Sequence, residues 1–338
     1  MLIVPLPQAG EQLKSTKGSR TATLRLLFSV SGGNAAVSDF DFSAIEEIGR
    51  RYDCACERDF VLKPLTTMDI GGKCGLFIEP NSEDCLREVL NACRLKKLPY
   101  FLLGKGSNLL INKYSGVVIK IGGSLGGFEF DGERVTAGAG GSLAALCTAA
   151  GNEGLAGMEC LYGIPGSVGG ALYMNAGAYG AEMKDIVRSA RCINERGEIV
   201  EIAAEEMGLS YRHSKFSENN YCILSVVMEL KRGSIDEIKA RMSEVAGKRR
   251  DKQPLEYPSC GSTFKRPEGY FAAALIEECG LKGCSVGGAQ VSEKHSGFVI
   301  NKGGAVFEDV MALVGHIKKI VLEQKGVELE CEMIILDE

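Results

Sequence analysis

Two short glycine loops carry the residue types that bind phosphate groups. One is Gly104-Lys-Gly-Ser-Asn108, and the other is Gly138-Ala-Gly-Gly141. Backbone N–H groups reach phosphate oxygens where no side chain intervenes. Leu109 and Leu143 break the G-x-G-x-x-G pattern, and no P-loop lysine spacing is present. Taken alone, each loop is therefore more typical of a turn than of a nucleotide site.

A denser glycine tract follows in the middle of the chain. It reads Gly163-Ile-Pro-Gly-Ser-Val-Gly-Gly170 and then Met174-Asn-Ala-Gly-Ala-Tyr-Gly180. Glycine loses more conformational freedom on folding than any other residue, so this density is costly unless the backbone must pack closely against something. A set of tight turns is the simpler alternative, and close approach to a ligand is the interpretation we favour.

The elements that must position these loops alternate between strand and helix. An apolar run at residues 99–103 is typical of a buried strand, and it follows a helical pattern that Ser82 would cap. The loop Gly104–Asn108 thus follows the second strand of a β-α-β unit, a common place for ligand loops. The apolar positions of that helix are Leu86, Val89, Leu90 and Cys93.

Two later elements complete the prediction. Ser234-Ile-Asp-Glu237 has the spacing of a capping box, so a helix should begin there. Residues 327–336 are expected to form a final strand. The residues of the helix expected to face inward are Ile235, Ile238, Met242 and Val245.

The composition is that of a folded protein that acts on a small molecule. The 338 residues are 45% apolar and 25% charged, and the net charge is −5. The sequence has no run of like charge that would bind nucleic acid. No apolar stretch approaches the ~20 residues that a membrane-spanning helix needs. We therefore predict two or three domains, a small-molecule partner, no nucleic acid and no membrane.

The cysteines indicate reduced thiols in the cytoplasm. Thirteen cysteines are scattered through apolar patterns, in a chain long enough not to need disulfides. Cys54 and Cys56 form a C-x-C pair, but no second pair stands at zinc-like spacing, so no metal site is predicted. Residues 1–39 are basic and differ from the rest; a leader, a transit-like arm and a family-specific extension stay open.

Six motifs then occur in a fixed order over most of the chain from Thr66 onward. They are Thr66-Thr-Met-Asp-Ile-Gly-Gly72, Gly104-Lys-Gly-Ser-Asn-Leu-Leu110, Gly163-Ile-Pro-Gly166 with Asn175-Ala-Gly-Ala-Tyr-Gly180, Tyr211-Arg-His-Ser214, Gly261-Ser-Thr-Phe264 and Leu329-Glu-Cys-Glu332. In this order they resemble the UDP-N-acetylenolpyruvoylglucosamine reductases of bacterial cell-wall synthesis. Six motifs in register are far more specific than any one of them.

The resemblance implies an α+β flavoenzyme, with a two-part FAD-binding module of the vanillyl-alcohol-oxidase type and a separate α+β substrate-binding domain. The FAD should be noncovalent, because no histidine falls in the glycine loops. NADPH is the implied reductant. The implied cofactor-binding residues are Gly104, Lys105, Gly106, Ser107, Asn108, Leu109, Gly138, Gly140, Gly163, Ile164, Gly166, Ser167, Gly169, Gly170, Asn175, Gly177, Ala178 and Tyr179.

The family reduces the enolpyruvyl ether of UDP-N-acetylglucosamine to UDP-N-acetylmuramate, a step of peptidoglycan synthesis. Reduction of an electron-poor alkene needs a hydride at one carbon, a proton at the other, and cationic groups where negative charge develops. By resemblance, Ser262 is the proton donor and Arg212 the active-site arginine. Glu332 matches the catalytic glutamate, although Glu328, Glu330 and Glu332 would share one face of a strand, so Glu330 stays a lesser candidate.

Weaker matches suggest the substrate contacts Lys252, Arg266, His295 and Asn301. The interval between Arg212 and Ser262 lacks the tyrosine-bearing insertion of some family members, so the chain resembles the shorter type. How the substrate diphosphate is held without that insertion stays open.

The predicted organisation is an extension over 1–39, FAD-binding subdomains over 40–118 and 119–233, and a substrate-binding domain over 234–338. We expect a cytoplasmic monomer. One alternative is another oxidoreductase on the same FAD module, which the loop 261–264 and Glu332 argue against. Another is a flavin- or nucleotide-sugar-binding protein without turnover, which the complete set of Arg212, Ser262 and Glu332 disfavours.

Overall fold

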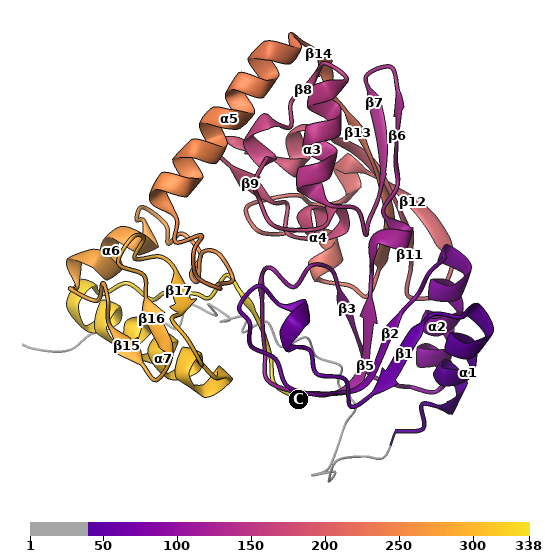
Figure 1. The fold of residues 1–338 in the computed structure, drawn as a ribbon, viewed down its shortest axis with the longest axis horizontal. Helices are drawn as coiled ribbons and strands as arrows, with labels where there is room; N and C mark the ends of the chain where they lie inside the picture. The colour runs from indigo at the N-terminus through magenta and orange to yellow at the C-terminus, as the bar shows by residue number, and fades with distance from the viewer. Residues whose placement is uncertain (1–39) are drawn as a thin grey trace, which may run out of the picture. The chain divides into compact units, whose positions relative to one another are not determined.

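The predicted β-α-β unit is present near the start of the computed structural model, which describes residues 40–338 (Figure 1). The predicted extension, residues 1–39, lies outside the described residues. The sheet has the strand order β1-β2-β5-β3, and β5 runs parallel to both β2 and β3. The elements here are α1 (Ser43–Tyr52), β1 (Ala55–Arg58), β2 (Cys74–Glu79), α2 (Glu83–Leu95), β3 (Tyr100–Leu103), β4 (Leu109–Ile111) and β5 (Tyr114–Lys120).

Helix α2 begins where the sequence predicts. The Ser82 hydroxyl accepts a hydrogen bond from the backbone N–H of Cys85 at 3.3 Å, and two acidic residues follow in the first turn. The predicted apolar face, from Leu86 to Cys93, is fully buried. Strand β3 then ends at Leu103, so the loop Gly104–Asn108 lies at its carboxyl end as expected.

The second part is built on an antiparallel sheet of order β12-β11-β13-β7-β6. Strands β6 and β7 pair as an antiparallel hairpin just before Ala139. The elements are β6 (Phe128–Asp131), β7 (Arg134–Gly138), α3 (Leu143–Asn152), β8 (Leu155–Ala156), α4 (Val168–Tyr173), β9 (Gly177–Ala178), β10 (Ala181–Glu182), β11 (Val187–Ile193), β12 (Ile199–Ala203), β13 (Cys222–Glu229) and β14 (Lys231–Arg232).

The last part contains a short sheet of order β15-β16-β17 and three helices. Figure 1 shows the long helix α5 running from β14 toward α6. The elements are α5 (Ile235–Lys252), α6 (Ala272–Glu278), β15 (Ser285–Val286), β16 (Ala289–Val291), β17 (Val299–Asn301), α7 (Phe307–Lys325) and β18 (Ile334–Leu336). Across residues 40–338 there are also six 3-10 turns, all of them before this last part: Lys63–Leu65, Gly123–Leu125, Glu159–Leu161, Met183–Asp185, Ala204–Glu206 and Lys215–Ser217.

Helix α5 corrects two predictions about its first turn. Ser234 precedes the helix, but its side chain makes no capping hydrogen bond, so the capping box is not formed. Ile235 is 42% exposed, whereas Ile238, Met242 and Val245 are buried as predicted. The first turn of α5 extends beyond the core that the rest of its apolar face covers.

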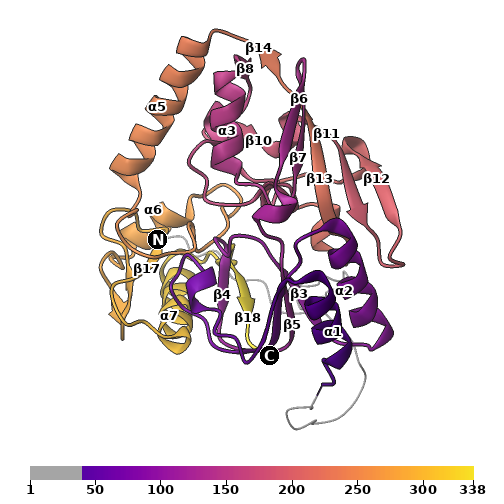
Figure 2. The same ribbon diagram turned by 45° about the vertical axis from the view of Figure 1, so that its right-hand side comes forward.

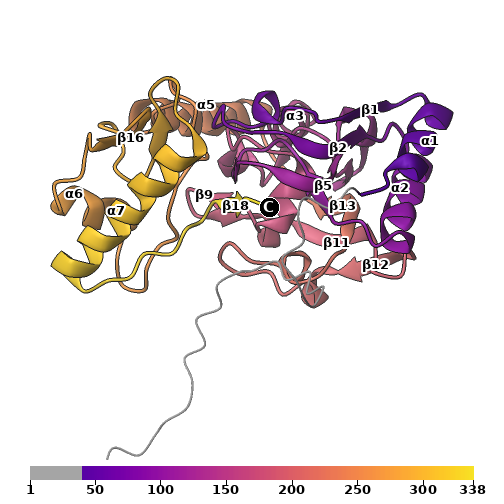
Figure 3. The same ribbon diagram turned by 90° about the horizontal axis from the view of Figure 1, so that it is seen from below.

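The predicted strand over residues 327–336 is wrong in extent, because only Ile334–Leu336 forms a strand, β18. It pairs in parallel with β4, with Ile334 opposite Leu109, and Figure 2 shows the two strands side by side. Before it, Cys331 forms an isolated bridge with Phe264. The last strand therefore pairs with the strand that follows the first glycine loop. Figure 3 shows β18 close to the C-terminus.

Buried side chains form one large apolar cluster that includes residues of both predicted FAD subdomains and also Ile238 and Met242 of α5, which belong to the predicted substrate-binding domain. A second cluster joins α6, α7 and β16 to Met68, Ile70 and Leu110. The predicted boundaries at 118/119 and 233/234 stay predictions. No helix within residues 40–338 is long and apolar enough to cross a bilayer.

Candidate active site

Glu332 is held by groups from three distant segments. Its backbone N–H donates to the carbonyl of Thr263 at 2.9 Å, and its carbonyl accepts from the Asn108 amide at 3.1 Å. Its carboxylate oxygen Oε1 lies 2.5 Å from Nε of Arg212. Glu332 is thus the point at which the first glycine loop, the Ser262 loop and the Arg212 turn meet.

Arg212 lies at the tip of a tight turn between Ser210 and His213, whose backbones exchange two hydrogen bonds of 3.1 Å. Its φ is +54°, a left-handed conformation that is uncommon outside glycine and that occurs where a side chain must be aimed. The Asn175 amide holds this turn by donating to the carbonyl of Ser210 at 2.9 Å. The turn presents Arg212 to Glu332 and to the carbonyl of Gly177, 3.4 Å from Nη2.

Ser262 lies in a loop that is pinned on both sides. The next residue, Thr263, donates its N–H to Gly297 at 2.9 Å, and its hydroxyl accepts from the N–H of Val299 at 2.9 Å. The Thr263 carbonyl accepts a hydrogen bond from the backbone N–H of Glu332. Ser262 is therefore adjacent in sequence to a residue that contacts Glu332. The partly buried Ser262 hydroxyl makes no hydrogen bond within residues 40–338, which leaves it available to a ligand.

Burial raises the pKa of the Glu332 carboxyl, and the Arg212 guanidinium partly offsets this rise. The Glu332 side chain is only 11% exposed. Glu330 instead faces solvent and pairs with Lys265 at 2.5 Å. The two glutamates, which the sequence pattern left together, are therefore in different environments.

The loop Gly104–Asn108 is arranged as a donor site for an anion. The backbone N–H groups of Lys105, Gly106, Ser107 and Asn108 donate no hydrogen bond to any described residue. Unpaired N–H groups of this kind bind phosphate oxygens or water. A Cβ at Gly166 would meet only the Ser107 hydroxyl oxygen, at 3.8 Å, so open space lies beside the loop. These features fit the pyrophosphate of a dinucleotide.

The glycine loops predicted to bind the cofactor lie against one another. The Lys105 ammonium donates to the Ser142 hydroxyl at 2.9 Å, and the Ser107 hydroxyl donates to the Pro165 carbonyl at 2.5 Å. Gly169 packs so closely on Ala139 that a Cβ there would lie 2.8 Å from the alanine Cβ. Close backbone packing thus explains part of the glycine density, as the sequence suggested.

Three other residues of the predicted cofactor-binding set are engaged with the protein itself. Leu109 begins β4 and is buried, and Ser167 caps α4 by accepting from the N–H of Gly170 at 3.2 Å. Asn175 is fully buried, and its amide is occupied by Glu182, Ser210 and Lys184. The Asn175 side chain therefore holds the turn that carries Arg212, and its contact with the cofactor stays a prediction.

A cavity of about 190 Å³ adjoins the predicted cofactor residue Gly138. It lies between the start of α2 and the strands β11 and β13, and the ion pair of Arg191 with Glu83 is part of its wall. Its other lining residues are Leu86, Ile121, Leu125, Gly127, Ile223, Leu224 and Ser225. The wall therefore combines apolar side chains with one ion pair.

Comparison with known proteins decides the family. Residues 75–203 match the family model described as an FAD binding domain, and residues 253–336 match the UDP-N-acetylenolpyruvoylglucosamine reductase C-terminal domain. The reductase of Clostridium novyi is 45% identical over 284 residues, covering 83% of this chain and 92% of that protein. The chain belongs to the UDP-N-acetylenolpyruvoylglucosamine reductase family.

Further comparisons agree. The reductase of Caldanaerobacter subterraneus is 46% identical over 279 residues, which is 82% of this chain and 92% of that protein. The crystal structure of the reductase from Thermus caldophilus has a TM-score of 0.73 and 35% identity, covering 84% of this chain and all of that one. The predicted fold class, an FAD-binding module with a reductase C-terminal domain, is confirmed.

The predicted activity and cofactors are confirmed as well. As a member of this reductase family, the chain is an FAD- and NADPH-dependent oxidoreductase that reduces UDP-N-acetylglucosamine enolpyruvate in peptidoglycan synthesis. Its partner is a small-molecule UDP-sugar. Within the described chain, the interval from Arg212 to Ser262 of this reductase holds one 3-10 turn, β13, β14 and α5, consistent with the shorter type.

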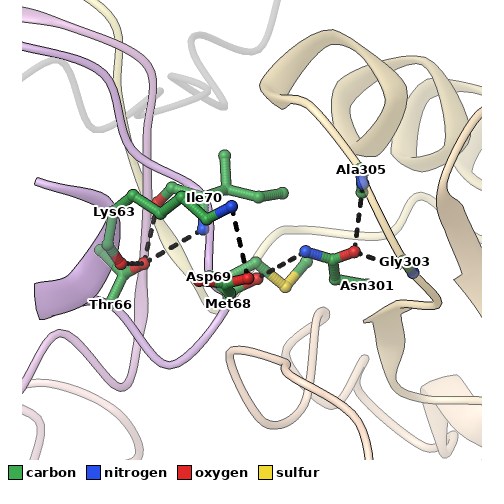
Figure 4. A network of polar contacts seen from close by, with 8 residues as sticks. All are labelled: Lys63, Thr66, Met68, Asp69, Ile70, Asn301, Gly303 and Ala305. Atoms are coloured by element: carbon green, nitrogen blue, oxygen red, sulfur yellow. Dashed lines mark hydrogen bonds and ion pairs between the residues drawn. The ribbon is translucent and has the colours of Figure 1, made fainter. Parts of the chain in front are cut away.

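The four predicted substrate contacts of this reductase lie in different environments. Lys252 ends α5 and is exposed, and Arg266 lies over the Phe271 ring at 4.6 Å. His295 is half-buried near the Ser262 loop, and burial lowers its pKa. Asn301 is buried; its amide donates to Met68 at 3.1 Å and accepts from Gly303 and Ala305 (Figure 4). Asn301 therefore joins two loops, and its role as a substrate contact stays a prediction.

One residue that links the site was not singled out from the sequence. Thr67 donates its N–H to the carbonyl of Gly106 at 3.1 Å and its hydroxyl to the carbonyl of Ser259 at 2.7 Å. It ties the first glycine loop to the segment that leads to Ser262. The only sequence signal was its place in the first matched motif, because a threonine in a loop has no pattern of its own.

Proposed function

We propose that Ser262, Arg212 and Glu332 carry out the proton transfer and charge stabilisation in the alkene reduction of this reductase. The reaction adds a hydride to one alkene carbon and a proton to the other, so negative charge develops toward the substrate carboxylate between the two steps. The proposal is carried by one observation, the convergence of the Arg212 turn and the Ser262 loop on Glu332.

Arg212 is the cation for this charge. Its guanidinium is planar and always protonated, so it can share hydrogen bonds between Glu332 and a substrate carboxylate. The left-handed turn and the buried Asn175 amide hold it in place before substrate arrives. A group positioned in advance does not need to reorganise as charge develops.

Ser262 is the proton donor. Its hydroxyl has no partner within the described chain, so it is free to reach a substrate carbon. A serine hydroxyl is a weak acid, and it needs nearby groups that stabilise the alkoxide formed when the proton leaves. Arg212 is the cation of the cluster, and Glu332 accepts a proton more readily than an exposed glutamate because burial raises its pKa.

The predicted cofactor-binding residues, Asn175 included, stay our proposed contacts of FAD. The free N–H groups of residues 105–108 bind the pyrophosphate of FAD, and Gly138, Gly140, Gly163, Gly166, Gly169, Gly170 and Gly177 allow close approach. When bound, FAD supplies the hydride for the reaction.

Lys252, Arg266 and His295 stay proposed substrate contacts, since all three lie on segments that flank the Ser262 loop. We also propose that the protein is cytoplasmic, which the reduced-thiol composition and the nucleotide-linked substrate support. We propose in addition that it is a monomer. Light scattering on the eluted chromatographic peak tests the monomer, and a mass of twice 36.2 kDa would contradict it.

The test of the catalytic assignment follows the flavin absorbance under anaerobic conditions. In wild type, the band bleaches with NADPH and returns when UDP-N-acetylglucosamine enolpyruvate is added. Ser262→Ala should keep the bleaching rate and slow the return by roughly 100-fold or more, the usual contribution of a general acid. Ser285→Ala, an exposed serine on β15, is the matched control. An unchanged return in Ser262→Ala would refute the proton-donor role.

A further inference from the structure

Thr67 makes hydrogen bonds in two directions, to the first glycine loop and to the segment that leads to Ser262. Its backbone N–H donates to the carbonyl of Gly106 at 3.1 Å. Its hydroxyl donates to the carbonyl of Ser259 at 2.7 Å, and its carbonyl accepts from the N–H of Ser259 at 3.0 Å. The hydroxyl is also 3.5 Å from the Gly106 carbonyl, so the shorter contact with Ser259 is its main hydrogen bond.

The loop that carries Thr67 keeps its conformation by other contacts. The Thr66 hydroxyl donates to the carbonyl of Ile70 at 2.8 Å and accepts from the Ile70 N–H at 3.3 Å (Figure 4). Met68 and Ile70 are buried in the second apolar cluster. The Thr67 hydroxyl takes no part in these contacts, so its removal should leave the loop folded.

The first glycine loop lies directly against this loop. Gly106 has a φ of +60°, and a Cβ there would lie 2.1 Å from the carbonyl oxygen of Leu65. Only glycine allows two backbones to approach so closely. Together with the hydrogen bond from Thr67 to Gly106, this contact fixes the two loops relative to each other.

The position of Ser262 depends on the residues on either side of it. Neither Gly261 nor Ser262 makes a backbone hydrogen bond with another residue of the described chain. After Ser262, the chain is fixed at Thr263. Before it, the chain is fixed at Ser259 by the two hydrogen bonds above, and at Cys260, whose thiol is a weak donor to a carbonyl of β4 at 3.1 Å.

We propose that Thr67 is a positioning residue for alkene reduction that acts through Ser262, an inference that rests on the proposed function. Proton transfer requires Ser262 to be aligned with the substrate while the glycine loops hold the cofactor. Thr67 holds both the first glycine loop and the segment before Ser262, so it sets their relative position. A misplacement of a reacting group by about 1 Å can slow a reaction by about 100-fold.

The test uses Thr67→Val, which removes the hydroxyl but keeps the branched shape and the backbone N–H. Under anaerobic conditions, the return of the flavin band with the UDP-sugar should slow roughly 10-fold, because Ser262 is less well aligned. The bleaching rate with NADPH and the flavin content should match wild type, because neither depends on Ser262. Thr67→Ser restores the hydroxyl and should recover most of the rate.

Thr148→Val is the matched control, because it removes a hydroxyl that donates to the carbonyl of Ala144 at 3.0 Å, within α3. It should match wild type in both half-reactions. A wild-type rate of return in Thr67→Val would overturn the proposal. So would equal slowing of the two half-reactions, or a Thr67→Ser variant as slow as Thr67→Val, since each of these indicates a structural role alone.

A double variant tests whether Thr67 acts through Ser262. Residues that act as one unit have non-additive effects, so adding Thr67→Val to Ser262→Ala should slow the return no further. Multiplication of the two single effects would overturn the proposal. Ser262→Ala alone decides the proposed function: a wild-type rate there refutes the proton-donor role, whereas a slow Ser262→Ala with a fast Thr67→Val refutes only this inference.

Discussion

Nε of Arg212 lies 2.5 Å from Oε1 of Glu332, across 120 residues of sequence. Both side chains are mostly buried, with 20% of Arg212 and 11% of Glu332 exposed. Removing one member of a buried ion pair leaves the other uncompensated, so the two residues should depend on each other for position and for charge. The pair leads to the first three predictions.

Arg212→Ala should slow alkene reduction by about 100-fold or more, because the charge developing on the substrate loses a preorganised donor. The rate of flavin reduction by NADPH should change by no more than about twofold, since that step does not use this charge. Stopped-flow absorbance at the flavin band measures both. Arg188→Ala, which breaks a surface ion pair with Glu229, is the control. Equal slowing of the two half-reactions would contradict the assigned role.

Glu332→Gln should lower the rate of alkene reduction and flatten its dependence on acid pH. Burial raises the pKa of Glu332 above the ordinary 4.5. In wild type, the rate should therefore fall as pH decreases through this raised pKa, because a protonated Glu332 no longer holds Arg212 by charge. The glutamine variant resembles the protonated state at every pH. If the rate of the variant fell at acid pH as the wild-type rate does, a group other than Glu332 would be responsible for the fall.

The same carboxyl should leave a signature in stability. Because its pKa is raised in the folded state, that state binds the proton more tightly than the unfolded chain. The contribution of Glu332 to the free energy of unfolding is then fully present below the unfolded pKa and decreases as pH rises through the folded pKa. Urea titrations of wild type and Glu332→Gln from pH 4 to 7 should show wild type losing stability relative to the variant as pH rises. The opposite slope would mean that pairing with Arg212 outweighs burial.

Gly140→Ala should destabilise the fold and reduce FAD occupancy. A Cβ at this position would overlap the carbonyl oxygen of Gly122, so the loop would have to move, at a cost of about 1–3 kcal/mol. Gly123→Ala is the matched control, since a Cβ there meets nothing within 4 Å. Thermal unfolding and the ratio of flavin to protein absorbance report the two effects. Equal behaviour of the two variants would refute the packing argument.

Local signals in the sequence mark the start of α2 and the end of α7. Ser82 caps α2, and Gly326 ends α7 in the left-handed conformation that glycine adopts at little cost. Such features act within one or two turns, so they are legible in the sequence. The first turn of α5 is an exception, because the core that should bury Ile235 ends before it.

Other outcomes depended on packing between distant segments. A strand was predicted over residues 327–336, but only Ile334–Leu336 forms one. These three residues pair with β4, which lies more than two hundred residues earlier in the sequence. Asn175 and Asn301 have the polar side chains of ligand contacts, yet both are buried and occupied by neighbouring protein atoms. Residue type alone does not tell which partner a polar group has.

The sequence by itself determined the order of the motifs, and with it the family, the cofactors and the identities of Arg212, Ser262 and Glu332 as candidates. The alternation of residues 328–332 did not by itself separate Glu332 from Glu330, and only the family resemblance favoured Glu332. Tertiary structure made that choice by burying Glu332 against Arg212 and leaving Glu330 with Lys265 at the surface. The physical reason is that a carboxyl's pKa and its partner are set by the dielectric and charges around it, which only the folded chain brings together.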